Sequence, residues 1–337
     1  MDYQITQANQ PLMPAYFQGR WAVKQIADRD VMYSTNLGAE IDFQVTDASF
    51  VRLTFLPLAY ELPSWVAIQI DGLPFQRQAV TNDPLWLTLD GRPHVVRVVL
   101  SGNTDEDRVW DGNQGFAVKA LTTDGELQPV RLGRHSVTWI GDSLTAGCWV
   151  MGKYPAEDYR AEANYAAVAS DLLNARNVRI AYSAVGLSKP GTGGVPVLPE
   201  VLTAVDSKTT WQPVPTDLVV INVGTNDRHT DDTTFTAVLR HFLNQVQTLY
   251  PNSRLAVMIP FNQNFAAIIR AVVAEFMQLQ LIETATWQLS TTDGVHLDLA
   301  GSRMAGKLTA QALRTQYPDV FGCKLIPETT FKRGYNE

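Results

Sequence analysis

The 337-residue chain has few cysteines and no long apolar run. Its two cysteines, Cys148 and Cys323, belong to no Cys-x-x-Cys pair, so the sequence predicts no disulfide framework. No run approaches the ~18 apolar residues that a membrane-spanning helix needs. The first residues have neither the basic nor the apolar region of a signal peptide. These absences predict a protein with no membrane association and a cytoplasmic location.

Positive charge is also scarce. Lys and Arg number 27 against 34 Asp and Glu, which gives a net charge of -7. General binding to nucleic-acid phosphates needs a basic surface, so we expect no nucleic-acid partner. No pair of histidines has zinc-ligand spacing, and we expect no metal and no other cofactor. The hydrophobic fraction of 45% predicts a globular protein with a sizeable core. Composition leaves the oligomeric state open, a homo-oligomer included.

Residues 1–130 are predicted to form a β-sandwich, jelly-roll-like in arrangement. Several short runs alternate apolar with polar or small residues, which is typical of strands with one buried face. Turn residues such as Asp71-Gly72 separate these runs. Many short strands at this spacing favour an all-β sandwich. The runs are 41–45, 50–55, 65–70, 85–89 and 94–100.

Residues 134–320 change character and predict an α/β domain. Strand candidates that are almost wholly apolar alternate with helix candidates, which is typical of a parallel sheet covered on both faces. The strand candidates are 136–142, 178–184, 217–223 and 254–260. The helix candidates are 162–175, 232–249, 263–280 and 298–316. Residues 321–337 are predicted as a C-terminal tail, too short to be a domain, that packs back on the sandwich.

The first strand of the α/β domain ends in Gly141-Asp142-Ser143. On its own this tripeptide also fits an ordinary turn or a helix N-cap. Three further stretches, 183–187, 223–227 and 292–297, follow later strands or precede the last helix. The carboxyl ends of parallel strands share one edge of a sheet, where ligands bind. We therefore expect all four stretches to meet.

Their residue types fit acyl transfer. A serine needs a base to attack an ester carbonyl at neutral pH, and His296 can deprotonate Ser143. Asp293, three residues before His296, can hold the imidazole in the right tautomer. A tetrahedral oxyanion needs preorganised donors. The candidates are the Ser143 and Gly186 N–H groups and the Asn226 side-chain amide, with glycine allowing close backbone approach.

These residues resemble the four ordered blocks of the GDSL/SGNH hydrolase superfamily over about residues 134–317. The blocks are Gly141-Asp142-Ser143-Leu144, Gly186, Gly224-Thr225-Asn226-Asp227 and Asp293-x-x-His296. The resemblance implies a flavodoxin-like three-layer fold. It also implies metal-free ester hydrolysis without the Gly-x-Ser-x-Gly elbow of α/β-hydrolases.

The whole chain resembles the two-domain carbohydrate esterase family 2, in which a β-sandwich precedes an SGNH domain. The cues are Gly19-Arg20-Trp21, Asp71-Gly72 and the segment 140–147. This resemblance implies hydrolysis of acetyl esters on a small-molecule or oligosaccharide substrate. The sequence departs from the family at Ala184, where glycine is expected, and at Cys148-Trp149, where Tyr-Gly is expected. Both departures bear on the shape of the acyl or leaving-group pocket.

Two alternatives stay open at this point. One is an esterase or thioesterase of the same superfamily that acts on lipid or aromatic acyl groups. The other is a glycan-binding protein with an inactive hydrolase domain, against which the four intact site residues argue. Asp142 and Asp227 are expected to brace their turns rather than to react. Four side chains near the site loops are candidates for substrate binding, each with a structural or surface role as the alternative: Trp149, Tyr154, Trp211 and His229.

Overall fold

The computed structural model describes residues 12–322, and residues 1–11 and 323–337 lie outside this described part. The tail predicted for 321–337, including its expected packing on the sandwich, therefore falls outside it except for Phe321 and Gly322. Within residues 12–322, no helix is long and apolar enough to cross a membrane.

The N-terminal part consists of two antiparallel sheets. One has the order β1-β4-β9-β6-β7, with β11 also paired to β4, and the other has the order β2-β3-β10-β5-β8. All five runs predicted as strands are confirmed, in β4, β5, β6, β8 and β9. The strands are β1 (Tyr16–Gln18), β2 (Ala22–Ile26), β3 (Arg29–Ser34), β4 (Glu40–Thr46), β5 (Phe50–Leu56), β6 (Trp65–Ile70), β7 (Gln76–Ala79), β8 (Leu85–Thr88), β9 (His94–Gly102), β10 (Phe116–Thr123) and β11 (Glu126–Pro129).

Alternation along β4 explains how this part folds. Ile41, Phe43 and Val45 are buried in the apolar core between the sheets. Glu40 and Asp42 alternate with them, and successive side chains of a strand point to opposite faces. Both acidic residues are nevertheless buried, because the outer face of this sheet is covered by the second domain.

The C-terminal part is built on a five-stranded parallel sheet of order β13-β12-β16-β17-β18. Its strands are β12 (His135–Gly141), β13 (Ala175–Ala181), β16 (Leu218–Asn222), β17 (Arg254–Met258) and β18 (Leu279–Ile282). The helices are α1 (Ser143–Ala146), α2 (Tyr165–Leu172), α3 (Asp232–Leu249), α4 (Ala266–Val273), α5 (Leu299–Gln316) and α6 (Pro318–Phe321). A 3₁₀ turn (Leu198–Glu200) and a small hairpin of β14 (Ala204–Asp206) and β15 (Thr209–Thr210) complete the described part.

The helices cover both faces of this sheet. One apolar cluster joins α2 and α5 to the face that carries Val137 and Trp139, and another joins α3 and α4 to the face that carries Ile140 and Val219. The predicted three-layer α/β architecture is thus confirmed. Such an arrangement leaves the carboxyl edge of the sheet open for a site.

One element prediction is wrong. The helix predicted over 263–280 is shorter: α4 ends at Val273, and the chain then forms β18, which pairs in parallel with β17. The run 279–282 is too short for its periodicity to distinguish a strand from the end of a helix. Residues 279–282 form a strand because they pair with β17 at the edge of the sheet.

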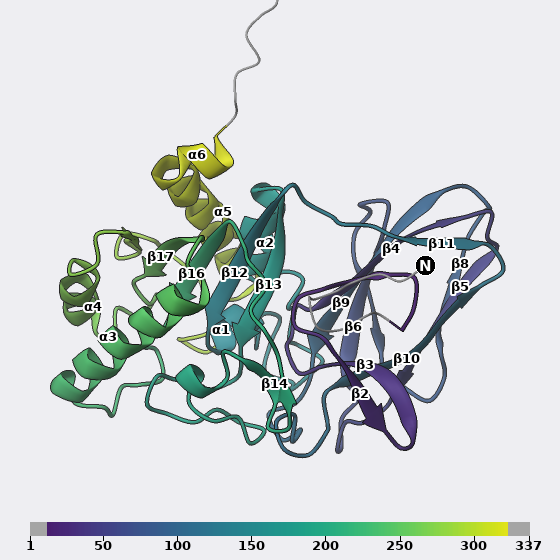
Figure 1. The fold of residues 1–337 in the computed structure, drawn as a ribbon, viewed down its shortest axis with the longest axis horizontal. Coiled ribbons are helices and arrows are strands. Elements are labelled where there is room, and N and C mark those ends of the chain that lie inside the picture. Colours follow the sequence, from purple (N-terminus) through teal and green to yellow (C-terminus); the bar gives the residue numbers. More distant parts are fainter. Residues whose placement is uncertain (1–11, 323–337) are drawn as a thin grey trace, which may run out of the picture.

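The two parts share an interface. Figure 1 shows the sandwich, coloured purple to blue, on the side of the parallel sheet where edge strand β13 lies. Buried side chains of the sandwich reach the backbone of the second part: Arg20 Nη2 donates to Val201 O at 2.7 Å and Asn36 Nδ2 to Ala181 O at 3.1 Å. Strand β11 ends at Pro129 and β12 begins at His135, on either side of the boundary predicted near residues 130–134.

Candidate catalytic site

Ser143 is the first residue of the one-turn helix α1, directly after β12. Asp142 caps this helix, and its Oδ1 accepts a hydrogen bond from the Leu144 N–H at 3.0 Å. Gly141 permits the close approach of Thr145, since a Cβ at position 141 would lie 2.2 Å from Thr145 Oγ1. The first N–H groups of a helix have no acceptor inside the helix, so the Ser143 N–H faces the open edge of the sheet as a potential donor.

The structure brings Ser143, His296 and Asp293 together. The Ser143 Oγ lies 2.8 Å from His296 Nε2, and His296 Nδ1 lies 2.8 Å from Asp293 Oδ2. The other carboxylate oxygen accepts from the N–H groups of His296 at 2.8 Å and Val295 at 3.0 Å. These contacts hold both side chains in one tight loop.

The same contacts keep Asp293 ionised. Partial burial acts to raise the pKa of Asp293, but hydrogen bonds from the His296 N–H, the His296 imidazole and the Val295 N–H outweigh it and lower that pKa. An ionised carboxylate beside Nδ1 fixes the proton on that nitrogen and leaves Nε2 as an acceptor facing Ser143.

Asn226 lies on the loop after β16 and reaches the same edge. Its Nδ2 donates to Val185 O at 2.9 Å, which uses one of the two amide N–H bonds and orients the other. The neighbouring Asp227 accepts from the N–H groups of Leu187 at 3.1 Å and Ser188 at 2.8 Å. Asp227 therefore makes the bracing contacts that the sequence predicts.

Gly186 lies at the site, but its N–H is engaged. It donates to Lys189 O at 2.8 Å, so in this conformation it is not free to receive an oxyanion. The position requires glycine for a steric reason as well, because a Cβ there would lie 2.6 Å from Asp227 Oδ1. The expected third donor, the Gly186 N–H, therefore lies at the site but donates to a carbonyl oxygen of its own loop.

Trp149 is the one predicted substrate-binding aromatic that contacts the site. Its ring centroid lies 6.3 Å from that of His296 and 5.1 Å from that of Tyr159, which packs edge-on against it. Thr292 Oγ1 donates to Trp149 O at 2.7 Å and so ties this residue to the histidine loop. Sequence reasoning did not single out Tyr159, which belongs to no motif, and it gave no role to Thr292, although the stretch 292–297 begins with it.

The other candidates lie differently. Trp211 is 3% exposed and packs in an apolar cluster with the Arg20 guanidinium 5.2 Å from its ring, so the substrate-binding prediction for it is wrong. Tyr154 is 75% exposed, and its N–H binds Asp158 on its own loop. His229 is exposed, and its Nε2 accepts from Arg228. Residues 12–322 contain no group of three or more His, Cys, Asp or Glu side chains arranged to hold a metal ion.

The family model that describes GDSL-like lipases and acylhydrolases matches residues 139–304. This segment contains the end of the strand that precedes Ser143 and the loop that carries His296. The segment from the end of β12 into α5 therefore matches a GDSL-like lipase or acylhydrolase domain. No curated protein sequence matches the chain.

Solved structures share the fold of most of the chain, with the sandwich and the α/β part together. A family two carbohydrate esterase from Clostridium thermocellum, solved in complex with cellohexaose, has a TM-score of 0.75 and 17% identity, covering 90% of this chain and 98% of that one. The acetyl xylan esterase Est2A from Butyrivibrio proteoclasticus has a TM-score of 0.72 and 19% identity, covering 94% and 98%. A family 2 carbohydrate esterase from Corynascus thermopiles has a TM-score of 0.71 and 18% identity, and the match covers 89% of this chain and 99% of that one.

At these identities the similarity is one of fold. It confirms the predicted resemblance to the two-domain esterases. The hydrolase family and the shared fold together support an acylhydrolase or esterase.

Proposed function

We propose that the protein is a metal-independent serine esterase that removes small acyl groups, chiefly acetyl, from sugars or oligosaccharides. The observation that carries this proposal is the hydrogen-bonded row Ser143–His296–Asp293, with both contacts at 2.8 Å. A serine, a base and an orienting carboxylate in one row is the arrangement that acyl transfer requires.

In the proposed reaction His296 Nε2 takes the Ser143 hydroxyl proton as Oγ attacks the ester carbonyl. Asp293 stabilises the imidazolium that forms. The tetrahedral intermediate collapses when His296 gives the proton to the departing alcohol oxygen, leaving an acyl-serine. Water, deprotonated by His296, then attacks the acyl carbonyl, and Ser143 recovers its proton as the carboxylate leaves.

The oxyanion is held by the Ser143 N–H and by the amide N–H of Asn226 that is not bound to Val185. Gly186 supplies a third donor once its hydrogen bond to Lys189 O opens. Two donors are therefore in place before substrate arrives, and the third depends on a small rearrangement of the 186–189 turn.

The sugar assignment rests on two supports. The first is the fold shared with esterases whose names specify carbohydrate, one of them solved with cellohexaose and another named an acetyl xylan esterase. The second is Trp149, whose ring beside His296 offers an apolar face to the C–H groups of a sugar. Tyr154 and His229 remain candidates for more distant contacts, since both are exposed.

Hydrolysis of an aryl acetate by purified variants tests the proposal. Ser143→Ala removes the nucleophile and should abolish turnover. Asp293→Asn should lower kcat by up to ~10⁴-fold, because the imidazole loses its correct tautomer. The exposed Ser207 provides a matched control, and Ser207→Ala should keep wild-type kcat.

Four outcomes would count against parts of the proposal. Unchanged turnover in Ser143→Ala contradicts the mechanism. A loss below about tenfold in Asp293→Asn indicates a Ser143–His296 dyad instead of a triad. Faster hydrolysis of an aryl octanoate than of the acetate favours a lipid esterase or thioesterase, and failure of a serine-reactive organophosphonate to label Ser143 favours a glycan-binding protein with an inactive domain.

A further inference from the structure

Arg179 lies buried next to the nucleophile helix. It comes from edge strand β13 and is 1% exposed. Its Nη1 donates to Ala146 O at 3.4 Å and its Nη2 to Ala161 O at 2.7 Å. Ala146 is the last residue of α1, the helix that Ser143 begins. The guanidinium therefore connects the far end of this one-turn helix to the segment that follows it.

This connection matters because α1 has only four residues. So short a helix has little stability of its own, and its orientation depends on its surroundings. A cation at the C-terminus of a helix is favourable, since the last carbonyl groups have no partner in the helix. The segments packed there are close: Arg160 N donates to Gly147 O at 2.8 Å, and a Cβ on Gly147 would lie 2.7 Å from Ala161 Cα. A shift of α1 would move both the Oγ and the N–H of Ser143.

The strongest compensating charge for Arg179 comes from the sandwich. All its hydrogen bonds go to neutral oxygens, the third from Nε to Asn177 Oδ1 at 2.9 Å. The same amide donates through Nδ2 to Glu40 Oε1 at 3.2 Å. Burial lowers the pKa of Arg179 to about 10, and the Glu40 carboxylate is the largest influence that raises it again.

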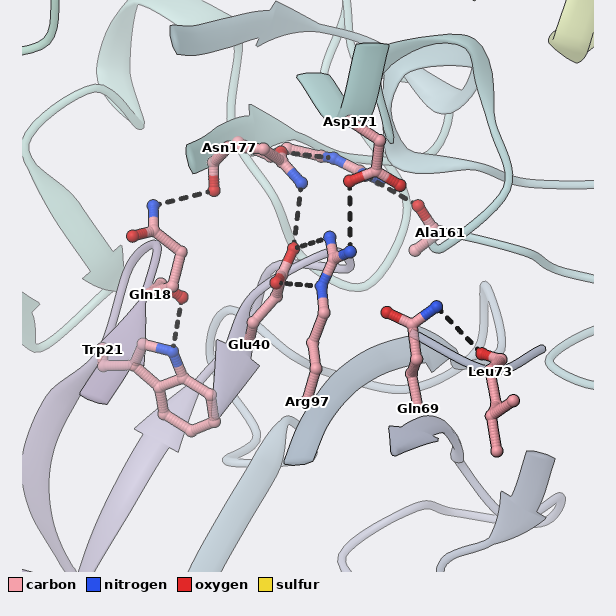
Figure 2. Close-up of polar contacts among 10 residues, drawn as sticks. Gln18, Trp21, Glu40, Gln69, Leu73, Arg97, Ala161, Asp171 and Asn177 are labelled. Atoms are coloured by element: carbon pink, nitrogen blue, oxygen red, sulfur yellow. Dashed lines mark hydrogen bonds and ion pairs between the residues drawn. The ribbon is translucent and has the colours of Figure 1, made fainter. Parts of the chain in front are cut away.

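Glu40 is itself held firmly. It is 3% exposed, and Arg97 binds both of its oxygens, at 2.6 and 2.8 Å. Arg97 also donates to Asp171 on α2 at 3.1 Å, and Gln18 Nε2 donates to Asn177 O at 3.0 Å. Figure 2 shows this network between the sandwich strands and the hydrolase domain, with Asn177 between Glu40 and the side chain that reaches Ala161.

We propose that Glu40, Asn177 and Arg179 form a positioning relay through which the sandwich holds the nucleophile helix in its reactive orientation. The proposal rests on the proposed esterase function and deepens it. The relay touches no substrate and acts through α1 alone. Its members are positioning residues: Glu40 supplies the charge, Asn177 transmits it through one amide, and Arg179 fixes the helix end.

A relay of this kind differs measurably from a contact that only stabilises the fold. Weakening it should lower kcat for an aryl acetate while KM stays near the wild-type value, because substrate contacts are intact and the nucleophile is misplaced. The rate at which a serine-reactive organophosphonate labels Ser143 should fall in parallel. A purely structural contact would lower the melting temperature and leave both rates unchanged in the folded fraction.

The experiment compares charge-removing variants on the two sides of the interface. Glu40→Gln should lower kcat and the labelling rate roughly tenfold, and Arg179→Met roughly 10²-fold, as expected for a nucleophile displaced by about 1 Å. Arg179→Lys should fall between Arg179→Met and the wild type. The matched control is Lys24→Gln, which removes another ion pair between the domains, that of Lys24 with Asp206, with no connection to α1.

Each outcome decides the matter. Wild-type kcat and labelling in folded Glu40→Gln overturn the relay, as does an equal loss in Lys24→Gln, which would point to the interface in general. If Arg179→Met does not fold, kcat and the labelling rate of Glu40→Gln and Asn177→Leu test the relay instead. A wild-type protein that neither turns over esters nor is labelled overturns the esterase function and the relay with it. An active wild type with unaffected variants overturns the relay alone.

Discussion

The two carboxylate oxygens of Asp142 lie in different surroundings. One oxygen caps α1 through the Leu144 N–H, whereas the other, Oδ2, is buried without a hydrogen-bond partner. Burial raises the pKa of Asp142 to about 6, against the lowering effect of the hydrogen bond from the Leu144 N–H. A charge is thus kept at the site at neutral pH at some expense of stability.

Asp142→Asn should show this expense as a pH dependence. A folded-state pKa of about 6, above the ordinary 3.8, means that the folded protein binds this proton more tightly than the unfolded chain. The resulting stability is present below pH 4 and is lost as the pH rises through 6. Asparagine keeps the cap and does not ionise. The free energy of unfolding of Asp142→Asn relative to wild type should therefore rise between pH 4 and 7.5, by on the order of 3 kcal/mol.

Urea unfolding of both proteins at the two pH values measures this difference. Wild-type unfolding contains the contributions of all other carboxylates, so the comparison of the two proteins isolates Asp142. An identical difference in free energy at pH 4 and pH 7.5 would contradict the assignment.

Residue types explain which parts of the site could be predicted. Ser143, Asn226 and His296 were predictable because their chemistry and order suffice to recognise them. Arg179 was not, since an arginine on a strand carries no sign of the carbonyl groups it will meet. Trp211 was mispredicted for a related reason: the sequence reveals a large aromatic near a loop, but not whether its ring faces the site or the core.

At the level of elements, prediction succeeded where local signals agree. Helices α3 and α5 begin within a residue of their predicted starts, because Asp231 and Asp298 cap them and an apolar stripe follows. Strand β18 was not predicted, because the periodicity of four residues is too short to distinguish a strand from a helix. The end of α1 was equally unpredictable, as it depends on packing between distant segments.

Gly147→Ala should disturb that end. Gly147 has φ +98° and its Cβ would lie 2.7 Å from Ala161 Cα, so alanine meets both backbone strain and a clash. Gly72 is the matched control, with φ +74° and nothing within 4 Å of its Cβ. Gly72→Ala should cost roughly 1–2 kcal/mol, and Gly147→Ala roughly 1–3 kcal/mol more.

Urea unfolding gives the two free energies, and aryl acetate hydrolysis gives kcat. Only Gly147→Ala should lower kcat, since only this residue adjoins the nucleophile helix. Equal losses of stability in the two variants, with equal kcat, would show that the contact with Ala161 does not constrain the site.

At the level of the molecule, the two parts share their apolar cores. Tyr33 and Trp110 of the sandwich belong to the cluster that also holds Tyr182 and Val201 of the hydrolase domain. Conversely, Cys148 of the hydrolase domain lies in the cluster that fills the sandwich. Removing either part would expose apolar surface and orphan buried polar groups on the other.

The whole chain should therefore unfold in one step. Differential scanning calorimetry of the full chain should give a single transition whose calorimetric and van't Hoff enthalpies agree. Two resolved transitions, or a van't Hoff enthalpy well below the calorimetric one, would show instead that each part unfolds independently.

The shared interface has a consequence for how such proteins can be recombined. The family model spans residues 139–304, but the relay proposed to hold the nucleophile helix begins at Glu40, outside that span. A sandwich exchanged for that of another esterase would bring its own outer face. A chimera of this kind would contain all three triad residues and still hydrolyse esters slowly, unless the residues on β13 that meet the new sandwich were exchanged with it.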